Sequence, residues 1–427
     1  MHLNLTQLIL LSVSVFLTVH GTITLIWMLY AWENPKSIKL RKAPKKYLSE
    51  RYSFTAIVPV RHEETVIEDT IRAINSINYP DGLKEILIVV RHDDKETIQK
   101  AHKITTRLGN ENIKVVVLVD SHPINKPISL NFGLKHARNQ IITIFDAEDE
   151  PYLDIYNIVN TVMQKSKVDV VQSGVQLMNY DSYWFSPLNI MEYYLWFKSG
   201  LNFFTDHGRT TLLGGNSVFI KKEFLNKING WDETCLTEDA DIAIRLSLAG
   251  AKIKIIYDEK SVTREETPNS VESFVRQRTR WNQGFLQILA KGDWLKLPLI
   301  RQKLVTFYML FAPFIPLLFF FYIPFGLWTT LIQQTPIVTA IITYVPFYIL
   351  CAIILVQIVG LREFTKTYNY KFYWYLPVKV IASYFPYMAL LVFSAGRSLV
   401  RFLISSNSWE KTTHLNIHRK NSLLERN

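Results

Sequence analysis

The sequence predicts an α/β domain, with a Rossmann-like and mostly parallel sheet, inserted between membrane-spanning helices. Residues 1–32 and 304–361 contain no Asp, Glu, Lys or Arg, and about 20 apolar residues are enough to cross a bilayer core. Between these regions, short runs rich in Val and Ile alternate with longer and more polar segments. Continuous apolar strands that alternate with helical segments are typical of a parallel sheet.

Six segments are expected along the 427 residues. Residues 1–32 should form an uncleaved transmembrane helix, because no basic start precedes the apolar run and no small-residue cleavage site comes after it. The segments after it are a basic cytoplasmic linker at 33–51, the α/β domain at 52–290, an interfacial amphipathic segment at 291–303, a membrane region of two to four hydrophobic segments at 304–404 and a basic tail at 405–427.

Charge and cysteine content indicate where the domain lies. The net charge is +11, and residues 36–51 hold seven Lys or Arg against one Glu. Basic residues next to a span mark the cytoplasmic side and attract anionic lipids, so we expect a multi-pass cell-membrane protein with a cytoplasmic domain. Cys235 and Cys351 cannot build a disulfide framework, in keeping with a reducing compartment. Nucleic acid is not an expected partner, since no binding motif for it is visible; an oligomer is compatible with the sequence.

The number of C-terminal crossings is left open by the sequence. Residues 304–361 fit two spans, separated by the polar break Gln333-Gln334-Thr335-Pro336. Residues 372–396 either cross once or are broken at Pro377 and Pro386 into a re-entrant or interfacial pair. Residues 294–301 are expected to lie flat in the membrane interface.

Five runs are predicted as buried strands, at residues 54–60, 86–90, 115–119, 141–145 and 168–171. Ligands of such sheets bind beyond the carboxyl ends of the strands, so the residues just after each run are candidates for chemistry. Three of the runs are followed by carboxylates. These are Glu63 and Glu64 after the first, Asp93 and Asp94 after the second, and Asp146, Glu148, Asp149 and Glu150 after the fourth.

Carboxylates gathered at one sheet edge repel one another, and a divalent cation is the simple way to offset that repulsion. Mg²⁺ and Mn²⁺ prefer oxygen ligands, and Mg²⁺ often takes few carboxylates together with substrate phosphates. We therefore predict a Mg²⁺ or Mn²⁺ site that neutralises a diphosphate. Its first-choice ligands are Asp146 and Glu148, followed by Asp149. The alternative for any one strand is a set of solvated loop carboxylates.

Two further motifs lie later in the domain. Thr237-Glu238-Asp239 precedes an amphipathic helix, where Thr237 suits an N-cap and the acids suit the positive first turn. In Gln277-Arg278-Thr279-Arg280-Trp281, Arg280 can grip phosphate and Trp281 can offer a flat face to a sugar ring. Helix capping and an amphipathic helix near the membrane are the alternatives for these motifs taken singly.

Together these motifs resemble the family-2 glycosyltransferases with a GT-A catalytic domain, in particular membrane-integrated cellulose, hyaluronan and other β-glycan synthases. The resemblance covers about residues 52–285 and extends to Trp409-Glu410-Lys411-Thr412-Thr413-His414. T-E-D followed 40 residues later by Q-x-x-R-W is a specific pair. Asp-Ala-Glu-Asp replaces the plain D-x-D of the family, a variant associated with glucan synthase-like members and some glycolipid glucosyltransferases.

The resemblance implies a role for each matched residue. Asp239 occupies the position of the catalytic base, next to Glu238. The implied donor-binding residues are Pro59, Glu63, Asp93 or Asp94, Lys126, Asp146, Gln277 and Arg280. The implied acceptor-binding residues are Gly215, Asn216 and Trp281, and the implied metal ligands are Asp146, Glu148 and Asp149. Arg91-His92 stands where small or acidic residues are more usual, which leaves the nucleotide base open.

The implied activity is inverting transfer of a hexose from a nucleotide-diphosphate sugar, with glucose and UDP favoured. Q-x-x-R-W favours a processive enzyme that extends a polysaccharide, whereas the small membrane portion favours a single transfer to a lipid such as diacylglycerol. Of these two acceptors we favour the polysaccharide. An inactive membrane scaffold would predict broken motifs, and a nucleotidyl- or phosphotransferase would explain the acids but not Trp281 or the T-E-D spacing.

Overall fold

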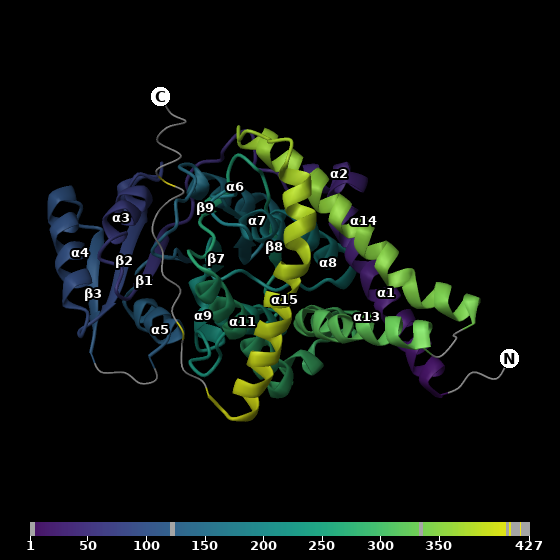
Figure 1. The fold of residues 1–427 in the computed structure, drawn as a ribbon. Helices are drawn as coiled ribbons and strands as arrows, with labels where there is room; N and C mark the ends of the chain where they lie inside the picture. Colours follow the sequence, from purple (N-terminus) through teal and green to yellow (C-terminus); the bar gives the residue numbers. More distant parts are fainter. Residues whose placement is uncertain (1–4, 120–123, 333–335, 407–409, 411–418, 420–427) are drawn as a thin grey trace.

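The expected α/β domain is present in the computed structural model, which describes residues 5–119, 124–332, 336–406, 410 and 419. A seven-stranded sheet has the order β3-β2-β1-β4-β7-β5-β8, and β6 pairs with β9 separately (Figure 1). The strands are β1 (Phe54–Val60), β2 (Lys84–Arg91), β3 (Ile113–Leu118), β4 (Ile141–Ile144), β5 (Val170–Gln172), β6 (Val175–Leu177), β7 (Val218–Lys221), β8 (Ile253–Ile255) and β9 (Thr263–Glu265). Only the two pairings of β7 are antiparallel in the larger sheet, so the prediction of a mostly parallel sheet is confirmed.

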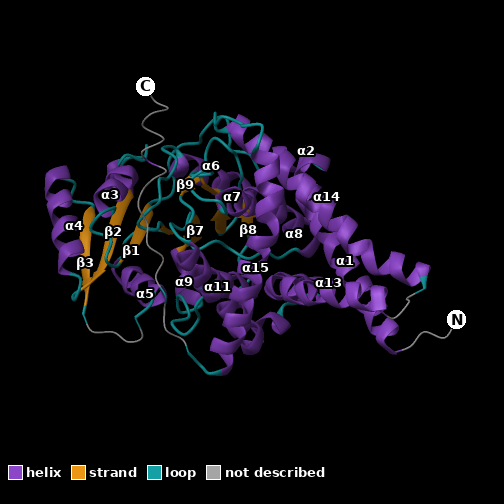
Figure 2. Cartoon of the chain, in the orientation of Figure 1, coloured by secondary structure: helices purple, strands orange, loops and turns teal. Residues whose placement is uncertain are grey.

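Helices cover both faces of the sheet (Figure 2). One face packs against α3 (Ile67–Asn75), α4 (Lys95–Leu108) and α6 (Ile155–Ser166). The other packs against α5 (Lys126–His136), α9 (Lys222–Lys227) and α10 (Glu238–Leu248). The remaining elements of the domain and its linker are α2 (Pro35–Lys39), η1 (Asp81–Leu83), α7 (Ser186–Leu195), the π-helix η2 (Trp196–Gly200), α8 (Leu201–Gly208), α11 (Val271–Lys291) and η3 (Asp293–Lys296).

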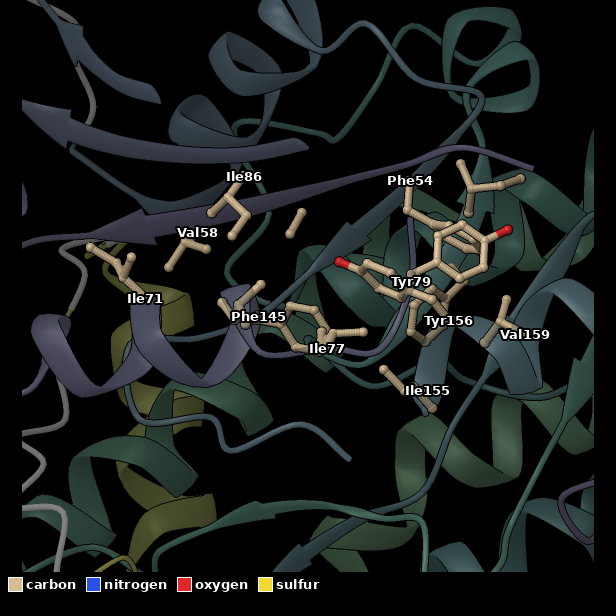
Figure 3. Packing of buried hydrophobic residues seen from close by; sticks show 14 of the residues in the cluster. Phe54, Val58, Ile71, Ile77, Tyr79, Ile86, Phe145, Ile155, Tyr156 and Val159 are labelled. Carbon is tan, nitrogen blue, oxygen red and sulfur yellow. The ribbon is translucent and has the colours of Figure 1, made fainter. Parts of the chain in front are cut away.

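Burial on both faces explains the continuous apolar strands. In β1, Phe54 and Val58 point to one core while Ile57 points to the other. The Phe54 ring stacks on Tyr156 with centroids 4.5 Å apart, and Tyr79 meets Phe54 edge-on at 5.2 Å (Figure 3). Such aromatic pairs add about 0.5–1.5 kcal/mol beyond simple burial. This core fixes the position of β1, at the centre of the parallel strands that carry the candidate site.

The strands β2, β1 and β4 are neighbours and run parallel. Their carboxyl ends therefore meet at one edge, as the sequence predicted for the three acidic clusters. Asn125 caps α5 by accepting a hydrogen bond from the Ile128 amide at 3.2 Å, and this places Lys126 in the first turn of α5.

Four helices are long and apolar enough to cross a membrane, judged by length and composition over the described residues. They are α1 (Leu5–Glu33), the run Ile300–Ile332 that contains α12 (Ile300–Phe311), η4 (Ala312–Phe314) and α13 (Ile315–Ile332), then α14 (Ile337–Thr367) and α15 (Leu376–Leu403). α1 and α14 run side by side in the same direction. The Ser14 hydroxyl donates to the Ile342 carbonyl at 2.6 Å, and the Trp32 indole donates to Glu363 at 3.1 Å.

α15 is one helix that continues through Pro386 and lies against α11. The Phe274 and Tyr387 rings are 5.4 Å apart, and the Arg401 guanidinium donates to the Gln283 side chain at 2.9 Å. α15 therefore ends beside the domain. This agrees with the contact of Arg419, whose Nη2 donates to the Asp149 carbonyl at 2.7 Å.

Two segments that flank the membrane helices are residues 294–301 and Trp409–His414. Residues 294–301 do not form one continuous helix, because η3 ends at Lys296 and extended backbone at Leu297 and Leu299 separates it from α12. The segment Trp409–His414 falls outside the described residues apart from Glu410. The Glu410 carboxylate pairs with Arg397 at 2.5 Å and with Arg401 at 3.1 Å.

Candidate functional site

A cavity of about 620 Å³ lies at the carboxyl edge of the sheet and extends to the membrane helices. Of the fifteen residues that the sequence predicted for the site, twelve line it. They are Pro59, Glu63, Lys126, Asp146, Glu148, Gly215, Asn216, Glu238, Asp239, Gln277, Arg280 and Trp281. Asp93, Asp94 and Asp149 are not part of its lining.

Lys126 lies at the centre of the charged part of the cavity. Its Nζ is 2.6 Å from the Asp146 carboxylate and 3.8 Å from Glu238, and it donates to the Gly215 carbonyl at 3.0 Å. Burial disfavours the charged ammonium, but Asp146 and Glu238 outweigh this effect and raise the pKa of Lys126 above its usual value. A permanently charged ammonium is therefore available to an anionic group that enters the cavity.

Asp239 lies in the first turn of α10, where its carboxylate accepts a hydrogen bond from the Ala240 amide at 2.9 Å. A Cβ added to Gly215 would lie 3.3 Å from Asp239 Oδ2 and 3.4 Å from Lys126 Nζ, so Gly215 leaves open the space between these two groups. Burial raises the pKa of Asp239, and Lys126 and Arg280 partly offset the rise. Burial also raises the pKa of Glu238, to about 7, although Lys126 acts against it.

The start of α10 is held against α11 through a glycine. Thr237 occupies the N-cap position but makes no side-chain capping hydrogen bond. Its side chain instead contacts Gly284 of α11, where an added Cβ would lie 2.7 Å from the Thr237 amide nitrogen. This close approach brings Asp239 and Arg280 to the same cavity.

The acids after β4 divide into two groups. Asp146 and Glu148 line the cavity, whereas Asp149 is fully buried behind them. The Asp149 carboxylate accepts hydrogen bonds from the Asp146 amide at 2.8 Å and from the Asn216 side chain at 2.8 Å. Asn216 also donates to Glu265. Asp149 thus holds the backbone of the loop that presents Asp146.

Glu265 is a cavity residue that the sequence reasoning missed. It ends β9 and is linked to Asp149 by the shared amide of Asn216. Burial raises the pKa of Glu265, to about 7, and the neighbouring charge of Glu148 adds to the rise. Apolar and polar residues do not alternate in Thr263-Arg264-Glu265-Glu266, so nothing in the sequence indicated that the Glu265 side chain faces inward.

The Q-x-x-R-W motif lies on α11 and presents Gln277, Arg280 and Trp281 to the cavity. The Arg280 Nε is buried and has no hydrogen-bond partner within the described part of the chain. An anionic ligand would satisfy it. Arg278, which the sequence reasoning also missed, lies 4.6 Å from the Trp281 ring centroid and pairs with Glu192 at 2.5 Å, so it fixes the indole.

The two acids that follow β2, Asp93 and Asp94, form contacts within their own loop and with α4. The Asp94 carboxylate caps α4 by accepting from the Thr97 amide at 3.2 Å, and it accepts from the His62 amide at 2.5 Å. Asp93 pairs with Arg91 at 3.2 Å, and the cavity is lined there by Arg91 and Arg61. The base-binding role predicted for Asp93 or Asp94 stays a prediction.

The carboxylates in the cavity can hold a divalent metal ion only if a bound substrate supplies further oxygen ligands. Within the ranges that the structure describes, no three His, Cys, Asp or Glu side chains form a group able to hold a metal. Asp146 and Glu148, which follow β4, both line the cavity, and Asp146 lies 2.6 Å from Lys126. Two carboxylates completed by substrate oxygens match the way in which Mg²⁺ is commonly bound.

Comparison with known proteins gives consistent matches. Residues 51–284 match the family described as glycosyltransferase like family 2. The chain is 25% identical over 292 residues to a probable glycosyltransferase, YdaM, of Bacillus subtilis (strain 168), over 66% of this chain and 67% of that protein. It is 24% identical over 306 residues to the poly-β-1,6-N-acetyl-D-glucosamine synthase of Staphylococcus epidermidis (strain RP62A), over 70% of each chain.

A further relative and a solved structure complete the comparison. The chain is 28% identical over 235 residues to the β-monoglucosyldiacylglycerol synthase of Nostoc sp. (strain PCC 7120); the match covers 54% of this chain and about half, 48%, of that protein. The mannosyltransferase PcManGT from Pyrobaculum calidifontis, solved with GDP-Man and Mn²⁺, superposes with a TM-score of 0.62 at 17% identity. The superposition covers 93% of this chain and 99% of that one. At this identity the likeness establishes the fold alone.

Proposed function

The chain belongs to glycosyltransferase family 2, and on that premise we propose that it transfers a hexose from a nucleotide-diphosphate sugar to a hydroxyl acceptor at the membrane, with inversion at the anomeric carbon. The observation that carries the proposal is the convergence of Lys126, Arg280 and Asp239 on one cavity. The two cations suit a diphosphate leaving group, and the carboxylate suits an acceptor hydroxyl. An inactive scaffold or a phosphotransferase gives no reason for this combination beside Trp281.

The proposed reaction is a direct displacement. The bond between the anomeric carbon and the diphosphate oxygen breaks as the acceptor oxygen bonds to that carbon, and the proton of the acceptor passes to the Asp239 carboxylate. Burial raises the pKa of Asp239 and strengthens it as a base, while Lys126 and Arg280 keep an ionised form accessible. General base catalysis is typically worth about 10²–10⁴-fold in rate.

The donor diphosphate is proposed to lie between Lys126 and Arg280. The buried Nε of Arg280, which has no partner within the described residues, supports this placement. A Mg²⁺ or Mn²⁺ ion held by Asp146 and Glu148 would supply charge neutralisation for the diphosphate. The Mn²⁺ in the complex of PcManGT is consistent with a metal of this kind.

The proposal also names the sugar nucleotide and the classes of acceptor. Glucose from UDP-glucose is the favoured donor, and the name of the Nostoc relative supports a glucosyl unit. The Staphylococcus relative is named for a polysaccharide and the Nostoc relative for a glycolipid, so both acceptors considered from the sequence have support. The two acceptors share the chemistry at Asp239 and differ in the group that carries the hydroxyl.

The proposed topology has three crossings, made by α1, α13 and α14, with the catalytic domain in the cytoplasm. The parallel packing of α1 and α14 supports this arrangement, since α13 must then return the chain between them. The basic residues Arg362 and Lys366 lie at the domain end of α14, as expected for the cytoplasmic side. Contacts of α15 with α11 support an interfacial position for α15, with the tail on the same side as the domain.

The proposal is tested by product analysis. Purified protein in lipid is incubated with Mn²⁺ and, in turn, labelled UDP-glucose, UDP-N-acetylglucosamine and GDP-mannose, and lipid-soluble product is separated from polymer. Asp239→Asn is expected to lower turnover by about 10²–10⁴-fold while the dissociation constant of the donor changes little, because the variant removes the base and keeps the shape. Near-normal turnover in this variant would remove Asp239 from the proposed role.

A further inference from the structure

We infer that the acceptor is a neutral membrane lipid with a free hydroxyl group, and that it enters from the bilayer through one end of the cavity. This inference rests on the proposed function and names its acceptor. We call the relevant part of the cavity the membrane limb. It is lined by side chains of α1, α12, η4, α13 and α15, among them His20, Trp27, Tyr308, Met309, Pro313 and Leu391.

The membrane limb joins the proposed base to helices that can cross the bilayer. The same cavity is lined by Asp239 of the α/β domain, in the part that we call the inner end, and by His20 of α1 in the membrane limb. His20 precedes Glu33, the last residue of α1, by 13 positions, which corresponds to about 20 Å along the helix. The hydrocarbon core is about 30 Å thick. An acceptor in the limb would therefore extend well into the depth of the bilayer while its hydroxyl lies near Asp239.

The lining of the limb suits an acyl chain better than a chain of sugars. The side chains of Met309, Pro313 and Leu391 have no hydrogen-bond donor. The Tyr308 hydroxyl and His20 Nδ1 are 3.0 Å apart and form a hydrogen bond with each other. Sugar hydroxyls that leave water need new partners, whereas apolar methylene groups gain by contact with apolar walls. A growing polysaccharide would leave many hydroxyl groups unsatisfied here, and a lipid tail would leave none.

Charge at the inner end argues for a neutral headgroup. Asp239 and Glu238 lie there, and the two cations beside them, Lys126 and Arg280, are assigned to the donor diphosphate in the proposed function. A lipid phosphate would be repelled by these carboxylates, and it would need no base because its oxygens are already ionised. A neutral hydroxyl is attracted as a hydrogen-bond donor and does require the base. Together, the lining and the charge select a lipid alcohol such as a diacylglycerol.

The test fills the limb without touching the donor site. Leu391→Trp places a larger side chain in the limb, and Ala312→Leu does so from η4, whereas Phe393→Trp is the matched control because Phe393 is 62% exposed on the same helix as Leu391. Each protein is placed in phosphatidylcholine vesicles with dioleoylglycerol, with polyprenyl phosphate or with neither, and is supplied with the same three labelled donors. Donor dissociation constants are measured in parallel to show that each variant is folded.

The expected result is sugar incorporation into dioleoylglycerol, lowered at least tenfold by Leu391→Trp and Ala312→Leu and unchanged by Phe393→Trp, with donor dissociation constants within twofold of the parent. Label in polymer alone, preference for polyprenyl phosphate, or full lipid activity in both limb variants would overturn the inference and leave the proposed function standing. Failure of every donor to label any product, despite donor binding, would overturn the proposed function itself.

Discussion

Substitution of Gly284 by Ala should lower turnover sharply although Gly284 does not line the cavity. An added Cβ would lie 2.7 Å from the Thr237 amide nitrogen, and ordinary contact begins at 3.4 Å. Relieving the overlap moves the start of α10, and with it Asp239, by about 0.7 Å relative to Arg280. A misplacement of about 1 Å can reduce rate by roughly 10²-fold, so we expect kcat to fall by about 10- to 100-fold and stability to fall by about 1–3 kcal/mol.

The assay for this prediction compares turnover with donor binding. Turnover is measured as release of the nucleoside diphosphate in lipid vesicles, and donor binding by calorimetry, so that an unfolded variant is recognised by loss of both. Gly396→Ala is the matched control, because Gly396 also lies within a long helix but has no atom of the described residues within 4 Å of an added Cβ. The control should keep full activity. If Gly284→Ala were as active as the control, the close packing of α10 on α11 would not be the contact that positions Asp239.

Three further predictions concern single contacts. Asp146→Asn should abolish the Mn²⁺ dependence of donor binding in calorimetry; unchanged dependence would count against Asp146 as a ligand. Arg280→Lys should weaken donor binding by about tenfold or more, because Lys lacks the planar fork that grips a diphosphate, and an unchanged dissociation constant would contradict this role. In the folded protein the pKa of Glu265 is raised to about 7, above its value of about 4.3 in unfolded chains. The folded state therefore binds the extra proton between these values, and the associated stability is lost as pH rises towards 7. Glu265→Gln should flatten the fall in melting temperature between pH 5 and 8, and an identical pH profile would refute the assignment.

Two short motifs, T-E-D and Q-x-x-R-W, indicated the protein family only when they were considered together. T-E-D and Q-x-x-R-W were each explicable as helix capping or as an amphipathic surface when taken alone. Together with the acids after apolar strands, the two motifs resemble those of family-2 glycosyltransferases, and the match of residues 51–284 confirmed the membership that this resemblance implied. The roles of Asp239, Lys126 and Arg280 remain predictions, but their convergence on one cavity results from strand order and helix packing.

Local hydrophobic pattern was enough to predict β1 to β5, the sheet edge where the acids gather and the apolar segments at residues 1–32 and 304–361. It did not predict the short strands β6 to β9, of which β7 and β8 complete the larger sheet, and it left open how residues 372–396 meet the membrane. Tertiary structure decided which acids reach the cavity. Asp94 caps α4, and Asp149 is buried and accepts a hydrogen bond from Asn216, so neither lines the cavity. Glu265, from a strand distant in sequence, does line it. Tertiary structure also decided that α15 lies along α11 rather than being broken at Pro386. These outcomes depend on contacts between segments far apart in the chain, and no local pattern of residues encodes such contacts.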